Sequence, residues 1–364
     1  MITKLVTWIV LAVLCSYGIK ILLLLDFNKR VFNHVPGPCV PVEGADHGSE
    51  DIELLSDGTA LISSGLKTPL MSAAVTAGLV GRILMFDFNA KAETKPHVEA
   101  LTIEGQFDTK TFNPHGMSSF TSKGRTTLYV INHKPERDTV ECFTFNKAKR
   151  TLTHTKTITN DLIYAANDLV VVGPDKFFIT NDRYFRHKWL LMIEQLLMLN
   201  LGNVVYYDGK ARLVDSWLSS PNGIAVEKKH KHLYVSHVMQ ETLAIYNITS
   251  DYNLVKNTDI SLLTSPDNLF VDESTGDLWL GAHPVAHRVV EHLRHPLTSS
   301  APSQVLHIRI QGGAHDRWVV TEAYANDGGL LWGSSSAVYY KERLLIGTVH
   351  HKLLHCTVLN PDLV

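Results

Sequence analysis

Two hydrophobic patterns divide the chain. Leu5 to Leu25 is a predominantly apolar run, interrupted by Gly18 and Lys20. Beyond Val40 the pattern changes to short apolar runs separated by polar turn residues. The first pattern is typical of a helix that enters a membrane, and the second is typical of β-strands joined by tight turns.

The N-terminal run covers about 21 residues, close to the roughly 20 that a helix needs to cross a bilayer. A cleaved signal peptide is the alternative. However, the run is longer than a usual signal-peptide core, and no small-x-small cleavage pattern precedes Asp26. Lys20 lies near the end of the run, from where its amine can reach the interface. We therefore predict a signal-anchor segment over residues 1–26 and one propeller domain over 27–364.

One sequence unit recurs six times after the leader: an apolar strand, a polar turn, and a second strand that ends in small or polar residues. A spacing of roughly 50 residues suits a four-stranded propeller blade. An irregular β-sandwich is the alternative, which six repeats of similar length disfavour. We predict an all-β, six-bladed propeller with short amphipathic helices on one face. The copies begin at Ile52, Phe120, Leu169, Ile224, Leu269 and Ala337.

Tyr184 to Leu201 breaks the strand pattern, because its apolar residues recur at helical spacing. The sequence predicts an amphipathic helix on one propeller face. It would serve as a lid or a core cap, and lying on a membrane is the physical alternative. The residues at this spacing are Trp189, Leu190, Ile193, Leu196, Leu197 and Leu201.

Polar residues precede five of the six inner strands. Because these strands run in the same direction around the central channel, their entrances meet on one axis. Carboxylates and amides are the ligands that calcium prefers, whereas zinc prefers nitrogen and sulfur. A single Asn or Asp at such a place is usually a turn residue, but the recurrence at blade spacing favours a metal site. The pairs are Glu50-Asp51, His115-Gly116, Asn167-Asp168, Asn222-Gly223 and Asp267-Asn268.

Two histidines belong to the blade whose entrance carries His115. His133 ends the second strand of that repeat. A histidine beside a Lewis acid can act as a general base toward water, and a second histidine can fix its tautomer. The alternative is two histidines that are simply packed in the channel. The remaining histidines, among them His230, His232, His350, His351 and His355, are expected at the surface.

Composition narrows the function only by exclusion. The 364 residues carry 34 Lys+Arg against 36 Asp+Glu. This near-neutral balance gives no reason to expect nucleic-acid binding. The sequence contains no HExxH, CxxC, P-loop, GxSxG or GxGxxG motif, which argues against the commonest hydrolase and nucleotide-binding classes.

From about Val35 to Leu359 the chain resembles the animal paraoxonase/arylesterase family. The resemblance rests on ordered segments that include GSEDIELLSDGTALISSGLK, FNPHGMS, NDLVVVGPDKFFITNDRYF, PNGIAV, DNLFVDESTGDLWLGAHP and LLIGTVHHKLLHC. It implies a six-bladed propeller that holds two calcium ions in its tunnel. It also implies calcium-dependent hydrolysis of lactones and aryl esters, with organophosphates as further substrates.

The resemblance assigns roles to individual residues. The catalytic calcium would be held by Glu50, Asn167, Asn222, Asp267 and Asn268, and the structural calcium by Asp51, Asp168 and the Met117 carbonyl. His115 and His133 would form the water-activating dyad. Cys39 and Cys356 would form a disulfide that closes the ring. A disulfide, calcium sites and the sequon at Asn247, on an expected turn, together favour the secretory pathway. The propeller would then be lumenal or extracellular and anchored, or secreted if the leader is cleaved.

The chain departs from the family pattern at Ala282, Thr68 and Arg183, which puts substrate preference in doubt but leaves the ligand set intact. A second function class stays open. Some membrane-anchored relatives act as non-enzymatic assembly factors for membrane proteins in the endoplasmic reticulum, and the long leader suits that role equally well. The complete ligand set with both histidines favours hydrolysis.

Overall fold

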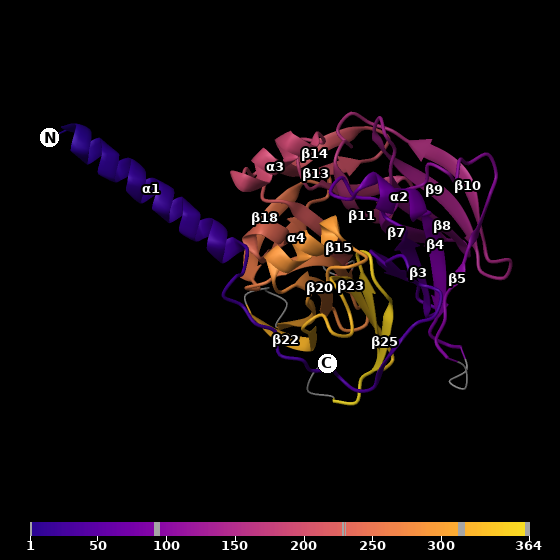
Figure 1. Ribbon diagram of the computed structural model, residues 1–364. Helices are drawn as coiled ribbons and strands as arrows, with labels where there is room; N and C mark the ends of the chain where they lie inside the picture. Colours follow the sequence, from indigo (N-terminus) through magenta and orange to yellow (C-terminus); the bar gives the residue numbers. More distant parts are fainter. Residues whose placement is uncertain (1, 91–94, 228, 230, 312–316, 361–364) are drawn as a thin grey trace.

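The computed structural model describes residues 2–90, 95–227, 229, 231–311 and 317–360. Six sheets are arranged around one axis, and the innermost strands contact one another in a closed ring (Figure 1). All strand pairs among the described residues are antiparallel except that of β6 with β10, which is parallel. The fold is therefore the predicted six-bladed propeller of four-stranded blades, with a fifth short strand, β6, added to one blade.

Each sequence repeat is the inner hairpin of one blade, which confirms the repeat assignment. The hairpins are β2 (Ile52–Leu54) with β3 (Thr59–Ser64), β7 (Pro114–Ser122) with β8 (Arg125–His133), β11 (Ala166–Gly173) with β12 (Lys176–Asn181), β15 (Pro221–Glu227) with β16 (His232–His237), β19 (Ser265–Val271) with β20 (Leu278–His283), and β23 (Ser334–Tyr340) with β24 (Arg343–Thr348).

The outer strands complete the blades in the same order. They are β4 (Arg82–Asp87) and β5 (Glu99–Ala100); β9 (Asp138–Asn146), β10 (Thr151–Ile158) and β6 (Thr102–Glu104); β13 (Gly202–Tyr207) and β14 (Ala211–Leu218); β17 (Thr242–Ile248) and β18 (Leu254–Ser261); β21 (Ser303–Gln311) and β22 (Arg317–Asn326); and β25 (Leu354–Thr357) and β1 (Cys39–Pro41).

Hydrophobic clusters lie between neighbouring blades rather than at one centre. One cluster joins Ile62 and Phe86 of the β2–β5 blade to Val338 of the β23 blade. Another joins Phe178 of the β11–β14 blade to Tyr246 of the β15–β18 blade. Packing apolar side chains between sheet faces leaves the axis free for polar groups. The fold therefore places a polar tunnel inside a ring of blades that pack together through apolar side chains.

The ring is closed by the N-terminal segment. Strand β1 pairs with β25, and Cys39 faces Cys356 in the register of that pair. These two cysteines form a disulfide across a sequence separation of 317 residues, as the resemblance implied. Cys15 and Cys142 carry free thiols.

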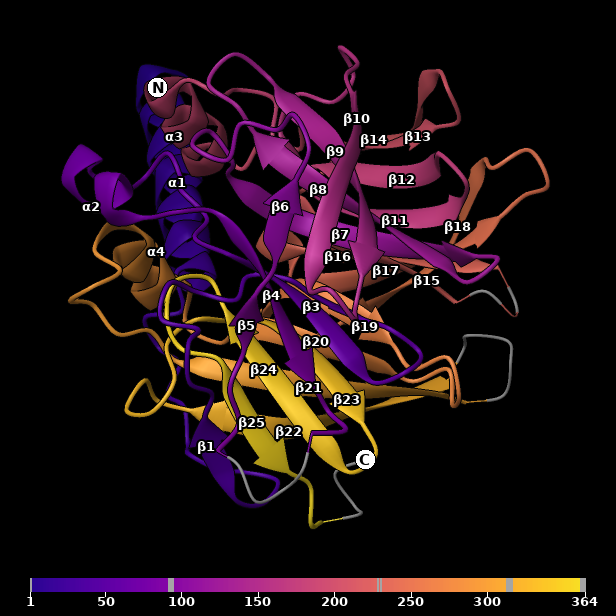
Figure 2. The ribbon, with the colours of Figure 1, turned by 90° about the vertical axis from the view of Figure 1, so that its right-hand side faces the viewer.

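Helix α1 (Ile2–Leu24) extends away from the propeller with none of its residues buried (Figure 1). Its 23 residues are long and apolar enough to cross a membrane, by length and composition. The short helices α2 (Ala73–Gly78), α3 (Lys188–Leu196) and α4 (Ala286–Arg294) lie on one side of the propeller (Figure 2), as predicted. A single 3-10 turn, η1, covers Val238–Gln240.

One sequence expectation outside the tunnel is confirmed only in part, and another is wrong. The amphipathic helix expected over Tyr184–Leu201 is present as α3, over Lys188–Leu196 only. Its apolar residues Trp189, Ile193 and Leu196 are exposed, which does not suit a core cap. The side of α3 that is buried carries Leu191 and Glu194, and Glu194 accepts the backbone N–H groups that precede the helix. Asn247 lies in strand β17, not in a turn, although its side chain is exposed.

Candidate metal centre and active site

Four of the five residue pairs expected on the axis lie in bulges at the entrances of the inner strands, and the fifth, Glu50-Asp51, directly precedes β2. The ladder register shifts between Pro114 and Met117, and equivalent shifts recur in β11, β15 and β19. A bulge lets two consecutive residues project from one side of a strand, where an unbroken strand would send them to opposite faces. The bulged pairs are His115-Gly116, Asn167-Asp168, Asn222-Gly223 and Asp267-Asn268.

Four oxygen atoms at this end of the tunnel are buried and have no hydrogen-bond partner among the described residues. They are Glu50 Oε2, Asn167 Oδ1, Asn222 Oδ1 and Asn268 Oδ1. All four are acceptors, and each comes from a different blade. Leaving such groups unpaired is costly, and water donors or a bound cation would compensate them. A hard divalent cation such as calcium fits this all-oxygen set.

The amide of Asn268 shows why its oxygen is available. Its Nδ2 donates to Glu50 O at 3.0 Å and to Glu50 Oε1 at 2.8 Å. These two bonds hold the two side chains together and leave Asn268 Oδ1 and Glu50 Oε2 without protein partners among the described residues. Ser335 adds a third bond, donating to Glu50 O at 2.6 Å.

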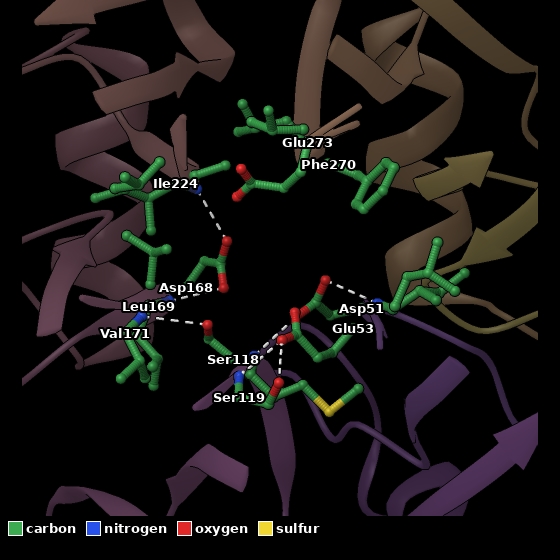
Figure 3. Close-up of a pocket in the computed structure, with 18 residues that line it drawn as sticks. Asp51, Glu53, Ser118, Ser119, Asp168, Leu169, Val171, Ile224, Phe270 and Glu273 are labelled. Carbon is green, nitrogen blue, oxygen red and sulfur yellow. Dashed lines mark hydrogen bonds between the residues drawn. The ribbon is translucent and has the colours of Figure 1, made fainter. Parts of the chain in front are cut away.

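A second group of carboxylates lies further along the tunnel. Asp51 and Asp168 line a cavity of about 120 Å³, whereas Glu50, Asn222 and Asp267 do not (Figure 3). Each aspartate also ties its blade to the next: Asp51 Oδ2 accepts Met117 N–H at 2.7 Å, and Asp168 Oδ2 accepts Ile224 N–H at 2.9 Å. The candidate ligands therefore occupy two levels.

Burial raises the pKa of Asp51 well above its ordinary value, and the Glu50 charge adds to the effect. Burial likewise raises the pKa of Asp168, with Asp51 as the next cause, and burial raises the pKa of Asp267. Buried carboxylates that repel one another in the tunnel would hold protons unless a cation compensates them. This repulsion is a second indication that the site is built for a metal ion.

The two predicted histidines form a relay with a third residue. His115 Nδ1 lies 2.9 Å from His133 Nε2, and His133 Nδ1 lies 2.9 Å from Asp138 Oδ1. If His133 donates to the carboxylate, its Nε2 accepts the proton of His115 Nδ1. The lone pair of His115 Nε2 is then on the tunnel side, 3.4 Å from Glu50 Oε1.

The relay residues differ in their electrostatics. Burial lowers the pKa of His133, although its bond to Asp138 acts in the opposite direction. Burial is the largest single effect on His115 and would lower its pKa. Glu50 together with Asp182 and Asp267 outweighs burial and raises that pKa above the ordinary histidine value. His115 is therefore the more basic of the two rings and the one that faces the tunnel.

Sequence reasoning missed two partners. Asp138 is the first residue of β9 and lies directly opposite His133 in the hairpin register. Because the turn between the two strands is short, this pairing could have been predicted from the sequence. His283 ends β20 as His133 ends β8, and its Nε2 lies 2.8 Å from Asp267 Oδ2. The recurrence of histidine at this strand end could have identified it.

The expectation that the other histidines lie at the surface is wrong for six of them. The buried ones are His232, His237, His283, His292, His307 and His350. His350 stands near His292, with ring centroids 6.0 Å apart, and burial lowers the pKa of His350 to about 3. His230 lies outside the described residues.

Gly116 allows the blades to approach at the metal centre. A Cβ there would lie 2.5 Å from Asp168 Cα and 2.5 Å from Asp168 Oδ1. We expect Gly116→Ala to displace Asp168 and to lower the free energy of unfolding by about 1–3 kcal/mol. Denaturant unfolding measures this loss. Gly78→Ala is the control, because nothing lies within 4 Å of its added Cβ. Equal stability of the two variants would contradict the tight packing described.

Fold and site together define a six-bladed propeller with an oxygen-lined tunnel entrance and a histidine relay beside it. The chain belongs to the arylesterase (paraoxonase) family, whose model matches residues 21–358. It is 39% identical to serum paraoxonase/lactonase 3 of Mus musculus over 92% of this chain and 94% of that protein. Members of this family depend on calcium.

Two further comparisons differ in kind. Mechanosensory abnormality protein 6 of Caenorhabditis elegans is 35% identical over 98% of this chain and 95% of that protein. Among solved structures, a gluconolactonase of Xanthomonas campestris covers 91% of this chain and 99% of its own, with a TM-score of 0.51 and 15% identity. At that identity the structural match concerns the fold alone.

Proposed function

We propose that this protein hydrolyses lactones and aryl esters, with organophosphates as a further substrate class, at the entrance of its tunnel. The observation that carries the proposal is the convergence of four unpartnered oxygens beside the His115–His133 pair. Calcium held there would supply a Lewis acid that polarises the carbonyl or phosphoryl oxygen of the substrate. Kinship with proteins named lactonase and arylesterase supports the same substrates.

The residues of the chain divide the remaining work. Glu50, Asn167, Asn222, Asp267 and Asn268 would hold the catalytic ion, and Asp51, Asp168 and the Met117 carbonyl the structural one. His115 Nε2 would take a proton from the attacking water. His133 and Asp138 would keep His115 in the tautomer that presents this lone pair. Glu50 and Asp267 are the competing candidates for general base, because both would lie beside the ion.

Exchange of His115 separates these candidates. His115→Gln is expected to lower kcat for phenyl acetate about 10²–10³-fold while the thermal unfolding temperature stays unchanged. His295→Gln is the control, because that side chain is exposed at the C-terminal end of α4. Full lactonase and arylesterase rates in His115→Gln would assign the base to a carboxylate instead.

The leader is proposed to remain attached as a membrane anchor, with the propeller in the lumen or outside the cell. Residues just after α1 are part of the folded domain: Asp26 is fully buried and accepts the N–H of Ala286 at the start of α4, at 3.0 Å. Leu25 O accepts from His287 Nδ1 at 2.8 Å. Cleavage near residue 25 would disturb these contacts. Intact mass of protein from secretory cells tests this, since a mass lacking the leader would show cleavage and secretion.

Helix α3 is proposed to rest on the same membrane. Its exposed apolar residues include Trp189, Ile193 and Leu196, and the hydroxyl of Tyr17 in α1 donates to Leu196 O. An apolar surface beside a membrane-spanning helix suits partial insertion into the interface.

A non-enzymatic role as a membrane-anchored assembly factor is the second candidate. The observation that favours it is the C. elegans relative, which is matched over 98% of this chain, leader included, and whose name states no enzymatic activity. The histidine relay favours hydrolysis, because an assembly factor has no need of an oriented general base.

A further inference from the structure

A second cavity lies where the chain leaves the membrane helix. It measures about 390 Å³, within the usual size range of ligand pockets. Residues 29–32 and His34 form one wall, and the opposite wall comes from the β19–β22 blade and the loop before β19. His34 pairs with Ala325 of β22 through two backbone hydrogen bonds of 3.0 Å, which fixes the wall in place.

Three acceptor groups belong to this cavity. Thr264 is 2% exposed, and its Oγ1 has no partner among the described residues; Gln304 Oε1 is likewise buried without one. Gln304 Nε2 donates to Glu322 Oε2, and this bond determines which end of the amide is the oxygen. The Glu322 carboxylate is the third acceptor: 39% of its side chain is exposed, and its Oε1 lies 3.3 Å from His34 Nδ1 in the same lining.

Of the two cationic side chains Lys29 and Arg30 at the cavity, the first is paired with carboxylates and the second is exposed. Lys29 Nζ lies 2.6 Å from Asp26 Oδ1 and 2.8 Å from Glu241 Oε1, so two carboxylates already compensate its charge. Arg30 is exposed at the rim. The rim also carries two exposed apolar side chains, Phe32 and Leu263.

We propose that this cavity binds the phosphoethanolamine headgroup of a membrane phospholipid. A primary ammonium has three N–H donors, which match the hydroxyl of Thr264, the amide oxygen of Gln304 and the carboxylate of Glu322. Arg30 would pair with the phosphate, while Phe32 and Leu263 would contact the first acyl carbons. The lipid comes from the membrane because the cavity wall begins five residues after the last residue of α1, Leu24. Only this choice of source rests on the proposed anchoring.

The test uses the full chain in maltoside micelles and isothermal calorimetry. Dihexanoyl-phosphatidylethanolamine is expected to bind at least about 10-fold more tightly than dihexanoyl-phosphatidylcholine, whose quaternary ammonium has no N–H. Glu322→Gln is expected to weaken the ethanolamine lipid about 10-fold or more, and Thr264→Val several-fold. Glu291→Gln, an exposed carboxylate of α4, is the control and leaves binding unchanged.

Three results would overturn the proposal: equal affinity for the two lipids, unchanged binding in Glu322→Gln, or equal binding of free O-phosphoethanolamine or inorganic phosphate. The last would point to a soluble ligand or a plain anion site. A thermal unfolding temperature of Glu322→Gln equal to that of the unmodified chain shows that the variant is folded. Because the readout is binding, the outcome is independent of whether the tunnel hydrolyses esters.

Discussion

Replacing Glu50 with glutamine is expected to lower kcat/KM for phenyl acetate and for a lactone by about 10³-fold or more. Glu50 is 2% exposed, and its Oε2 is one of the unpartnered oxygens at the tunnel entrance. Glutamine keeps the shape but removes the charge that would hold the ion and stabilise the His115 cation. Steady-state kinetics at saturating calcium measures the effect.

The matched control is Glu53→Gln, in the same blade. Glu53 lines the cavity at the second level, where its Oε1 accepts from Ser119 N–H at 2.8 Å and from Ser119 Oγ at 2.6 Å. An amide oxygen can accept both bonds, so kcat/KM is expected to change less than 10-fold. If Glu50→Gln were as active as Glu53→Gln, the proposed role of Glu50 as a calcium ligand would be contradicted.

Loss of the Cys39–Cys356 disulfide is expected to cost about 2–5 kcal/mol of unfolding free energy. The bond closes a loop with a sequence separation of 317 residues and holds β1 against β25, the pair that completes the last blade. Denaturant unfolding of the Cys39→Ser/Cys356→Ser double variant measures the loss.

Cys15→Ser is the control for the disulfide, because Cys15 is a free, exposed thiol in α1. Its unfolding midpoint is expected to match that of the unmodified chain. A double variant as stable as this control would show that strand pairing alone closes the ring.

The periodicity of the chain was sufficient for the fold, because each repeat of strand, turn and strand is a local signal. That the candidate ligand residues would lie together near the axis was also predictable, since propeller geometry brings strand entrances together. The sequence did not show how two adjacent residues such as Asn167 and Asp168 can both project toward the central axis. That depends on the bulge in β11, which arises from strand pairing and not from local residue preference.

The helix in the Tyr184–Leu201 segment was predicted, but the environment of its apolar face was not. In water, an apolar stripe at helical spacing predicts a helix face that packs against the protein. Beside a membrane, the same face can be exposed to lipid. Here Trp189 and Ile193 are exposed, and the carboxylate of Glu194 is buried because it satisfies backbone N–H groups. Asp138 was missed because its role comes from the partner strand: it faces His133 across the hairpin.

Calcium-dependent turnover by the full chain tests the central claim most directly. The purified protein in maltoside micelles would be assayed on a lactone panel and on phenyl acetate, with calcium and after chelation. The proposal predicts turnover that chelation abolishes and readdition of calcium restores. A folded protein that binds calcium but hydrolyses none of these substrates would contradict it and favour the assembly-factor role.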